Sequence, residues 1–293
     1  MRATAASAPR LDFHLHTQAS DGALSPREAL AAARREGLAA ISICDHDTVD
    51  AYGDEPSTRR PSEGWGGLPE GWREGRDPRV LPGVELSVGV DGQEIHILGY
   101  FASGFPPELC ELIETLIDER TSRIRRSVER LQSRGVPLSW EEVLRETTGR
   151  VVGQWHLARA LVRKRVVENL KAAFERVLGG GTPGTGIVEA PRCAASTAIR
   201  SIADGGGIAV WAHPSSQHIE RYAAAFAAAG LRGVELFTPR RGRSDTERIA
   251  AQLPRLGLFA TGGSDWHGHP GQTLGRFTVR PEQVEAFLAA VGW

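Results

Sequence analysis

Two histidines near the start of the chain have the spacing of a metal-ligand pair. His14 and His16 stand two residues apart in the apolar stretch LDFHLH, which predicts a strand, so both imidazoles project from the same face. Asp21 follows in the predicted loop. An isolated H-x-H pair is more typical of surface or core histidines than of a metal site, so this hypothesis needs ligands from elsewhere in the chain.

Further histidines and carboxylates stand at the ends of other predicted strands. Imidazole and carboxylate ligands without thiolates favour Zn, Mn or Fe, and more ligands than one ion can use indicate two or three ions. Burying Glu85 or Asp265 without a cation would be costly. Asp265 and His267 repeat the spacing of the first pair, as expected if a barrel brings its first and last strands together. The full candidate set is His14, His16, Asp21, His46, Glu85, His96, His156, His213, Asp265 and His267.

Some of these residues also have plain structural explanations. His156 opens a predicted helix and could serve only as a polar cap. His213 precedes a proline and could merely end a strand. Asp45 and Asp47 flank His46, where they could cap the next segment or orient its imidazole, and the second role is the favoured functional one.

A strand-helix-strand unit positions the first ligands. The helix after LDFHLH begins at Ser25-Pro26, carries the capping-box residue Glu28 and ends at Gly37. Residues 38–44 predict a second buried strand, which ends directly at Asp45. The polar residues therefore follow the C-terminal ends of strands, where parallel α/β sheets and barrels carry their chemistry.

The rest of the chain alternates between strand and helix patterns around two unusual segments. Residues 52–82 are rich in Gly, Pro and Trp and predict a long loop or lid. A hairpin is expected to turn at residues 90–93, where Asp-Gly is a turn signal. Residues 106–178 predict helices from their three- and four-residue apolar spacing, and the Gly-rich stretch 179–186 closes them. Strand-helix alternation resumes after residue 187.

The bulk composition is that of an ordinary globular chain. Of 293 residues, 41% are hydrophobic and 24% charged, and the net charge of −1 predicts no general attraction to nucleic acid or membranes. Three cysteines without a close pair fit a reducing compartment, and no apolar run suits a signal peptide or a membrane span. We therefore expect a cytoplasmic protein that binds neither a membrane nor duplex nucleic acid stably. Its oligomeric state stays open.

Eight motifs, in order along residues 11–279, resemble the PHP (polymerase and histidinol phosphatase) superfamily. The likeness is strongest to its bacterial phosphoesterases that act on nucleoside 3′,5′-bisphosphates and short oligonucleotides. The resemblance implies an α/β fold, a distorted seven-stranded (β/α)7 barrel with a helical insertion and a trinuclear metal site. The motifs are FHLHT (13–17), SDG (20–22), DHDT (45–48), PGVE (82–85), IHILGY (95–100), HLARALV (156–162), AHP (212–214) and TGGSDWHG (261–268).

Together with the element pattern, the resemblance implies a division of the chain. Residues 10–105 and 187–293 are expected to form the barrel, residues 106–186 the helical insertion, and residues 1–9 a disordered leader.

The resemblance also implies how the ions share their ligands. Glu85 is the bridging carboxylate. The other common bridge, a carboxylated lysine at a strand end as in the related amidohydrolase barrels, does not suit a chain whose only lysines are Lys164 and Lys171. The implied sets are His14, His16, Glu85 and Asp265 for one ion, Glu85, His96 and His156 for a second, and Asp21, His46 and His267 for a third.

Two side chains are implied to act on the substrate itself. His213 matches the family's AHP histidine, a catalytic residue that protonates the leaving oxygen or binds phosphate; Asp265 is the second implied catalytic residue. Arg123 matches an arginine that recurs in the inserted helix and is the candidate substrate-binding residue, with a solvated helix face as the alternative. Arg120 is a weaker candidate.

These expectations combine into a metal-dependent phosphoesterase. Two or three divalent ions (Mn²⁺, Zn²⁺ or Fe²⁺) activate water for attack on a phosphomonoester, most of all a nucleotide such as a 3′,5′-bisphosphate or a short oligonucleotide. The alternatives are hydrolysis of histidinol phosphate or of another small or cyclic phosphate, and a non-catalytic metal-binding module. Two departures from the family, Gln154-Trp155 in place of Arg-Pro and the segment 51–81, have no role that the sequence assigns.

Overall fold

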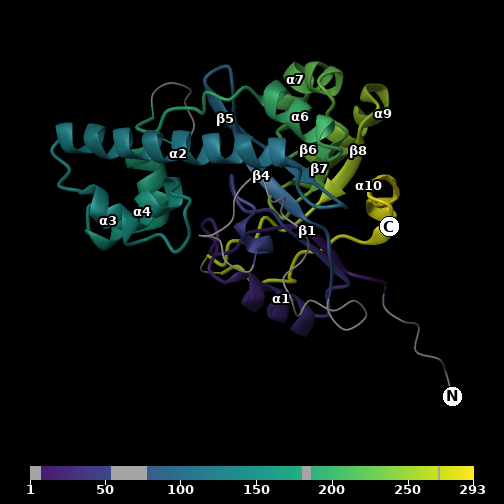
Figure 1. Cartoon of the computed structure of the whole chain (residues 1–293), viewed down its shortest axis with the longest axis horizontal. Helices are drawn as coiled ribbons and strands as arrows, with labels where there is room; N and C mark the ends of the chain where they lie inside the picture. Colours follow the sequence, from purple (N-terminus) through teal and green to yellow (C-terminus); the bar gives the residue numbers. More distant parts are fainter. Residues whose placement is uncertain (1–7, 54–77, 180–185, 270) are drawn as a thin grey trace.

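The structure is a computed structural model that describes residues 8–53, 78–179, 186–269 and 271–293. The predicted leader, residues 1–9, and the Gly/Trp-rich segment 51–81 lie largely outside the described residues. The mixed α/β class is as expected (Figure 1).

The first strand-helix-strand unit is confirmed. β1 (Leu11–Leu15) and β2 (Ala40–Ile43) pair in parallel, and α1 (Pro26–Arg35) connects them. Ser25 caps this helix, because its side chain accepts the Glu28 N–H while the Glu28 side chain accepts the Ser25 N–H. The two-residue strand β3 (Arg79–Val80) joins the other side of β2 in parallel.

A five-stranded sheet forms the second part of the framework. Its β4–β5 hairpin turns at Asp91 and Gly92, whose φ angles of 47° and 74° suit the predicted two-residue turn. β5 is antiparallel to both neighbours, whereas the last three strands run parallel. The strands in order are β4 (Gly83–Val90), β5 (Gln93–Tyr100), β6 (Ile208–Trp211), β7 (Gly233–Phe237) and β8 (Phe259–Gly262).

Two isolated bridges connect the two sheets. Leu15 at the end of β1 bridges to Trp266 after β8, and His46 after β2 bridges to Glu85 in β4, both in parallel. The strands are otherwise hydrogen-bonded as sheets of three and five, so a closed seven-stranded barrel stays a prediction. The bridges bring the candidate ligands of both sheets to one place.

Helices cover the five-stranded sheet on the outside. α6 and α7 lie beside β6, and α9 and α10 lie near β8 (Figure 1). The core between helices and sheet contains Trp211, Ile199 and Phe226, all buried. The helices are α6 (Ala195–Asp204), α7 (Ser216–Ala228), α8 (Arg243–Ala250), α9 (Leu253–Leu256) and α10 (Glu285–Ala290), with 3₁₀ turns at Asp50–Tyr52 and Pro281–Gln283.

The predicted helical segment is helical, and it has a hydrophobic cluster of its own. The N-terminal half of α2 packs on the main core through Ile113, whereas its C-terminal half packs through Val128 on Leu157 and Leu161 of α4. α3 and α4 lie beneath the outer half of α2 (Figure 1). The elements are α2 (Pro107–Ser133), α3 (Trp140–Leu144), α4 (Gln154–Arg163), α5 (Leu170–Ala172) and a π-helical turn, Ala173–Leu178.

Within the described ranges, no helix combines the length and the apolar character needed to cross a membrane.

Candidate metal centre

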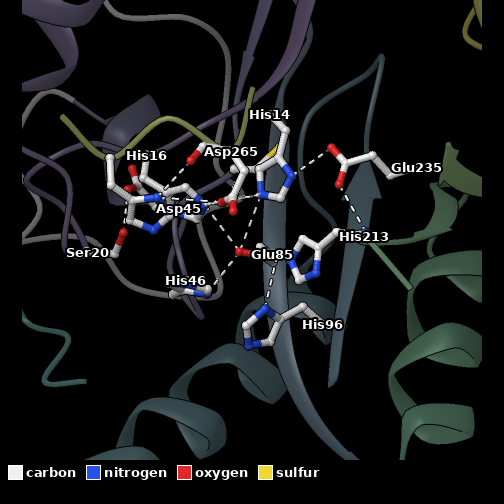
Figure 2. Close-up of polar contacts among 12 residues, drawn as sticks. His14, His16, Ser20, Asp45, His46, Glu85, His96, His213, Glu235 and Asp265 are labelled. Atoms are coloured by element: carbon white, nitrogen blue, oxygen red, sulfur yellow. Dashed lines mark hydrogen bonds and ion pairs between the residues drawn. The ribbon is translucent and has the colours of Figure 1, made fainter. Parts of the chain in front are cut away.

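Most of the candidate ligands meet around Glu85. His14 lies in β1, and Glu85 and His96 lie in β4 and β5 (Figure 2). The other ligands of the cluster lie in the loops that follow β1, β2 and β8: His16, Asp21, His46, Asp265 and His267. Three overlapping groups have ligand atoms within 4.8 Å of one another. The groups are His14, His16, Glu85 and Asp265; His16, Asp21, His46 and His267; and His46, Glu85 and His96.

The Glu85 carboxylate is at the centre of these contacts. Its Oε2 lies 3.0 Å from His46 Nδ1 and 3.2 Å from His16 Nε2, and its Oε1 lies 3.2 Å from His96 Nδ1. The side chain is fully buried, and neither oxygen has a hydrogen-bond partner among the described residues. His16 Nδ1, His46 Nδ1, His96 Nδ1 and His267 Nε2 are likewise buried without such a partner. Orphaned acceptors facing one another are what bound cations would satisfy, so the residues fit a metal centre.

The electrostatics of the cluster also suit cations. Burial raises the pKa of Glu85, but the imidazoles of His14, His46 and His96 outweigh burial and hold the pKa well below its usual range. The pKa of Asp265 is likewise held well below its usual range, chiefly by the hydrogen bond with His16 against the effect of burial. Both carboxylates are therefore ionised and able to bind metal at neutral pH.

Glu235 in β7 orients the ligands of two strands. Its Oε1 lies 2.9 Å from His14 Nδ1, which leaves His14 Nε2 facing Glu85 and Asp265. Its Oε2 accepts the His213 N–H at 3.0 Å. The sequence analysis missed this residue, although the tetrapeptide GVEL at 233–236 repeats the GVEL around Glu85 and places a carboxylate inside a buried strand.

We expect Glu235→Gln to lower metal affinity and activity by about 10- to 100-fold, the usual effect of removing a carboxylate that holds a ligand histidine. A metal-competition titration would measure the affinity. Glu247→Gln is the matched control, because Glu247 is a surface residue of α8 whose side chain pairs, within the described part of the chain, only with Arg243. Equal metal affinity in the two variants would contradict this role of Glu235.

Asp45 and Asp47 hold loops around the centre rather than the His46 ring. Asp45 accepts hydrogen bonds from the Thr17 N–H, the Thr17 hydroxyl and the Ser20 hydroxyl, at 2.6 to 2.7 Å. These bonds fix the loop that carries Asp21. Asp47 accepts the Ser87 N–H and the Arg120 Nε–H, both at 2.7 Å, and so joins the end of β2 to β4 and α2.

Backbone strain is concentrated at the same strand ends. Asp47, His213 and Asp265 have φ angles of 49°, 36° and 50°, a region that residues other than glycine rarely adopt. The turn at Asp265 is held by Asp12, whose Oδ1 accepts the Ser264 N–H at 2.8 Å. Strain of this kind persists only where surrounding contacts enforce it, and it is typical of functional sites.

Of the ligands predicted for the second ion, Glu85 and His96 meet in the structure, but His156 does not join them. His156 is buried, but it stands in none of the three groups found among the described residues, and its Nδ1 accepts the Gly153 N–H at 2.9 Å. His213 stands in none of these groups either, but it contacts the central carboxylate: its Nε2 lies 3.3 Å from Glu85 Oε1, the oxygen that His96 also contacts.

Arg123 was the stronger predicted substrate-binding residue of α2 and Arg120 the weaker one, but their surroundings favour the reverse order. Arg123 is buried and donates to Glu94 Oε2 at 2.8 Å and to the Glu189 carbonyl at 2.7 Å. Arg120 is buried as well, but it lines a cavity beside the ligands. The weaker sequence candidate is therefore the arginine that the structure brings to the site.

Two cavities adjoin the cluster, at different ligands. One is lined by Asp21, His46, His96 and Arg120 together with the aromatic side chains of Trp155 and Phe174. The other is lined by His213 and Asp265 and by the loop after β7, which carries Arg240 and Arg241. A substrate can approach the ligands from either cavity.

The histidine pKa values predict how the stability of the metal-free protein depends on pH. Burial lowers the pKa of His16 and His96, but carboxylate neighbours overcome it: Asp265 and Glu85 raise the pKa of His16 to about 9, and Glu85 raises that of His96 to about 10. Stability from a raised histidine pKa is complete below the unfolded value near 6.5 and is lost as the pH rises through the folded value.

Chelated protein should therefore lose stability, on the order of a few kcal/mol, between about pH 6.5 and pH 10. Metal-loaded protein should lack this particular loss, since metal ligands are already deprotonated. Thermal unfolding at a series of pH values, with and without chelator, measures both. A chelated protein that gains stability over this range would refute the expected protonation of His16 and His96.

The chain is similar to known proteins over most of its length. It is 31% identical to the 5′-3′ exoribonuclease Rnm of Salmonella typhimurium, over 94% of this chain and 91% of that protein. It is 29% identical to the 3′,5′-nucleoside bisphosphate phosphatase of Chromobacterium violaceum, over 90% of each. No protein-family model matches the chain.

Two solved structures share the fold over 96% of both chains. One is a protein from Chromobacterium violaceum described as an amidohydrolase, with bound sulfate and no metal, at a TM-score of 0.78 and 28% identity. The other, from Bifidobacterium adolescentis and described as a candidate metal-dependent phosphoesterase, has a TM-score of 0.75 and 27% identity.

Proposed function

The chain belongs to the PHP superfamily of metal-dependent phosphoesterases, and we propose that it removes a phosphate group from a nucleotide at the cluster centred on Glu85. It is a phosphoric ester hydrolase. The observation that carries the site is the set of three overlapping ligand groups around one buried carboxylate without hydrogen-bond partners. Bound divalent ions lower the pKa of water toward neutrality and neutralise phosphoryl oxygens.

We place two or three ions, Mn²⁺, Zn²⁺ or Fe²⁺, in this cluster. For the first ion we keep the predicted ligands His14, His16, Glu85 and Asp265. For the third ion we keep Asp21, His46 and His267, which His16 joins in the same group. For the second ion we propose His213 in place of His156, beside Glu85 and His96. The 3.3 Å contact between His213 Nε2 and Glu85 Oε1 supports this change.

The protein's own residues then orient the reaction. Glu85 would be a ligand shared by two of the ions, Glu235 holds the His14 ring, and Asp45 holds the loop that presents Asp21. Asp265 would be a ligand of the first ion, and it also lines the second cavity. We propose that Arg120, rather than Arg123, contacts a substrate phosphate, because only Arg120 of the two lines a cavity at the ligands.

A nucleotide is the substrate that the cavity with Trp155 suits best. The Trp155 and Phe174 rings lie 4.6 Å apart between centroids, and Trp155 stacks on His269 at 3.9 Å. Aromatic walls of this kind bind bases by stacking, whatever the sequence. The two relatives are named for a nucleoside bisphosphate and for RNA, which supports the same choice.

A substrate panel tests the proposal. With Mn²⁺ added, we expect the highest kcat/KM for a nucleoside 3′,5′-bisphosphate or a 5′-phosphorylated dinucleotide, and lower values for histidinol phosphate and a ribose cyclic phosphate. Turnover of histidinol phosphate but of no nucleotide would overturn the substrate assignment. Absence of turnover on every ester would overturn the proposed function.

Trp155→Ala is expected to raise KM for a nucleotide about 10-fold, because a base loses its stacking partner. The effect on glycerol phosphate, which has no ring to stack, should be smaller. Trp140→Ala is the matched control, since Trp140 lies against Arg125 on the helical segment and lines neither cavity. Equal KM changes for both substrates would argue against a base site at Trp155.

We also propose the expected architecture of a seven-stranded barrel with residues 106–186 as a helical insertion. The bridges at Leu15–Trp266 and His46–Glu85 support closure, and seven strands result if β3 and β4, two residues apart, count as one. The separate hydrophobic cluster around Val128 and Leu157 supports the insertion. A cytoplasmic location completes the proposal.

A further inference from the structure

Arg241 is a buried cation whose donors are largely unused. It follows β7 in the loop that lines the cavity at His213 and Asp265. Its side chain is only 5% exposed, and its Nε and Nη1 have no hydrogen-bond partner in the described part of the chain. Only Nη2 is engaged, donating to the Glu235 carbonyl at 3.3 Å.

The charge of Arg241 is also poorly balanced. Its nearest carboxylate oxygen, Asp245 Oδ2, lies 3.8 Å from Nη1, and the Asp245 side chain is 40% exposed. Burial lowers the pKa of Arg241, and Asp245 and Glu235 offset this only in part. A desolvated guanidinium with free donors is costly unless an anion occupies the space that it faces.

We infer that the cavity at Arg241 is a second anion subsite, which binds a phosphate group of the substrate other than the one being hydrolysed. This inference rests on the proposed function. His213 and Asp265 line the cavity on the side of the metal ligands, and Arg241 lines it in the loop after β7, so one substrate can reach both. The guanidinium fork of Arg241 matches phosphate oxygens in geometry and charge.

Neighbouring residues add to the subsite. Arg240 also lines the cavity; its side chain is 72% exposed, and its Nη1 lies 3.7 Å from Asp265 Oδ2. Ser215, the N-cap of α7, also lines the cavity, and the 13-residue helix directs the positive end of its dipole to the same side. The bound group can be the terminal phosphate of a mononucleotide or the phosphodiester of a short oligonucleotide.

The test compares Arg241→Gln with Arg243→Gln. Arg243 is the first residue of α8, directly after the loop that carries Arg240 and Arg241, but its side chain is 92% exposed, pairs with Glu247 and does not line the cavity. The measured quantity is the ratio of kcat/KM for a nucleoside 3′,5′-bisphosphate to that for each nucleoside monophosphate. We expect Arg241→Gln to lower this ratio about 10- to 100-fold, as for a lost charged hydrogen bond, and Arg243→Gln to leave it unchanged.

A binding measurement makes the subsite independent of turnover. Calorimetry with the full, metal-loaded chain and a nucleoside monophosphate, the product that keeps the second phosphate, should show a Kd raised by the same factor in Arg241→Gln. The parent nucleoside should bind both proteins alike. If no ester is hydrolysed but this difference appears, the proposed function fails and the subsite stands.

In Arg241→Gln, kcat/KM relative to the monophosphate can fall for the bisphosphate alone, which supports a subsite for a terminal phosphate. If it falls also for a 5′-phosphorylated dinucleotide, the subsite binds a phosphodiester as well. If Arg241→Gln leaves the ratio of kcat/KM for bisphosphate to that for monophosphate unchanged, the subsite is overturned. This includes an equal loss of kcat/KM for both substrates together with a lower metal content, because Arg241 would then act only through Glu235. Should Arg241→Gln fail to fold, Arg241→Lys and the exposed Arg240→Gln give the same comparison.

Discussion

Glu85→Gln is expected to lower kcat/KM by about a thousandfold or more, roughly 4 kcal/mol of transition-state stabilisation. The substitution keeps the shape of the side chain but removes the charge that two ligand groups share. An amide offers one acceptor oxygen, so it cannot bridge the positions now contacted by His46 and His96. Steady-state kinetics and metal content per chain measure the loss together.

A graded series provides the control for this variant. The expected order of effect is Glu85→Gln, then Glu235→Gln, then Glu247→Gln, because these residues lie at the ligand cluster, behind it and on the surface of α8. Circular dichroism should show the same fold in all three. Near-normal activity and metal content in Glu85→Gln would refute the bridging role.

Metal removal is the second change with a large expected effect. Dialysis against a chelator should lower turnover by about a thousandfold or more, since metal-activated water and charge neutralisation are lost together. Adding Mn²⁺ or Zn²⁺ back should restore it. Protein prepared without chelator should contain two or three transition-metal ions per chain by elemental analysis.

The metal count distinguishes the possible centres. Two or three ions match the three overlapping ligand groups. One ion per chain, or full activity in chelator, would contradict the multinuclear centre. Activity lost in chelator and restored by one equivalent of metal would leave a mononuclear hydrolase and remove Glu85 from its bridging position.

Local features of the fold were predictable because each depends on a few neighbouring residues. The capping box at Ser25 and Glu28 and the hairpin turn at Asp91-Gly92 have short-range physical causes, and both are confirmed. The periodicity of residues 106–178 likewise predicted helices, because apolar spacing reflects the helical repeat. The closed barrel depends on how strands pair at long range, and it stays a prediction.

The site shows the same division. His14 and His16 share a face because alternate residues of one strand always do, and the two are 3.1 Å apart between their Nε2 atoms. The role of Glu235 was not predictable, because it requires β7 to place a carboxylate beside a histidine 221 residues earlier in the chain. Equally, α2 presents Arg120 to the cavity and Arg123 to Glu94 and Glu189, which sequence spacing does not distinguish.

By itself, then, the sequence determined which residue types are available for metal binding, the strand ends at which they stand and the family to which the chain belongs. Only the tertiary structure decided which of them meet: His213 rather than His156 reaches Glu85, and Glu235 orients His14. It also places Arg241, two of whose donors have no partner among the described residues, in the lining of a cavity beside the ligands. The physical reason is that ligand types and strand positions are encoded over a few residues. Contacts over a few ångströms between distant segments depend on how whole strands and helices pack.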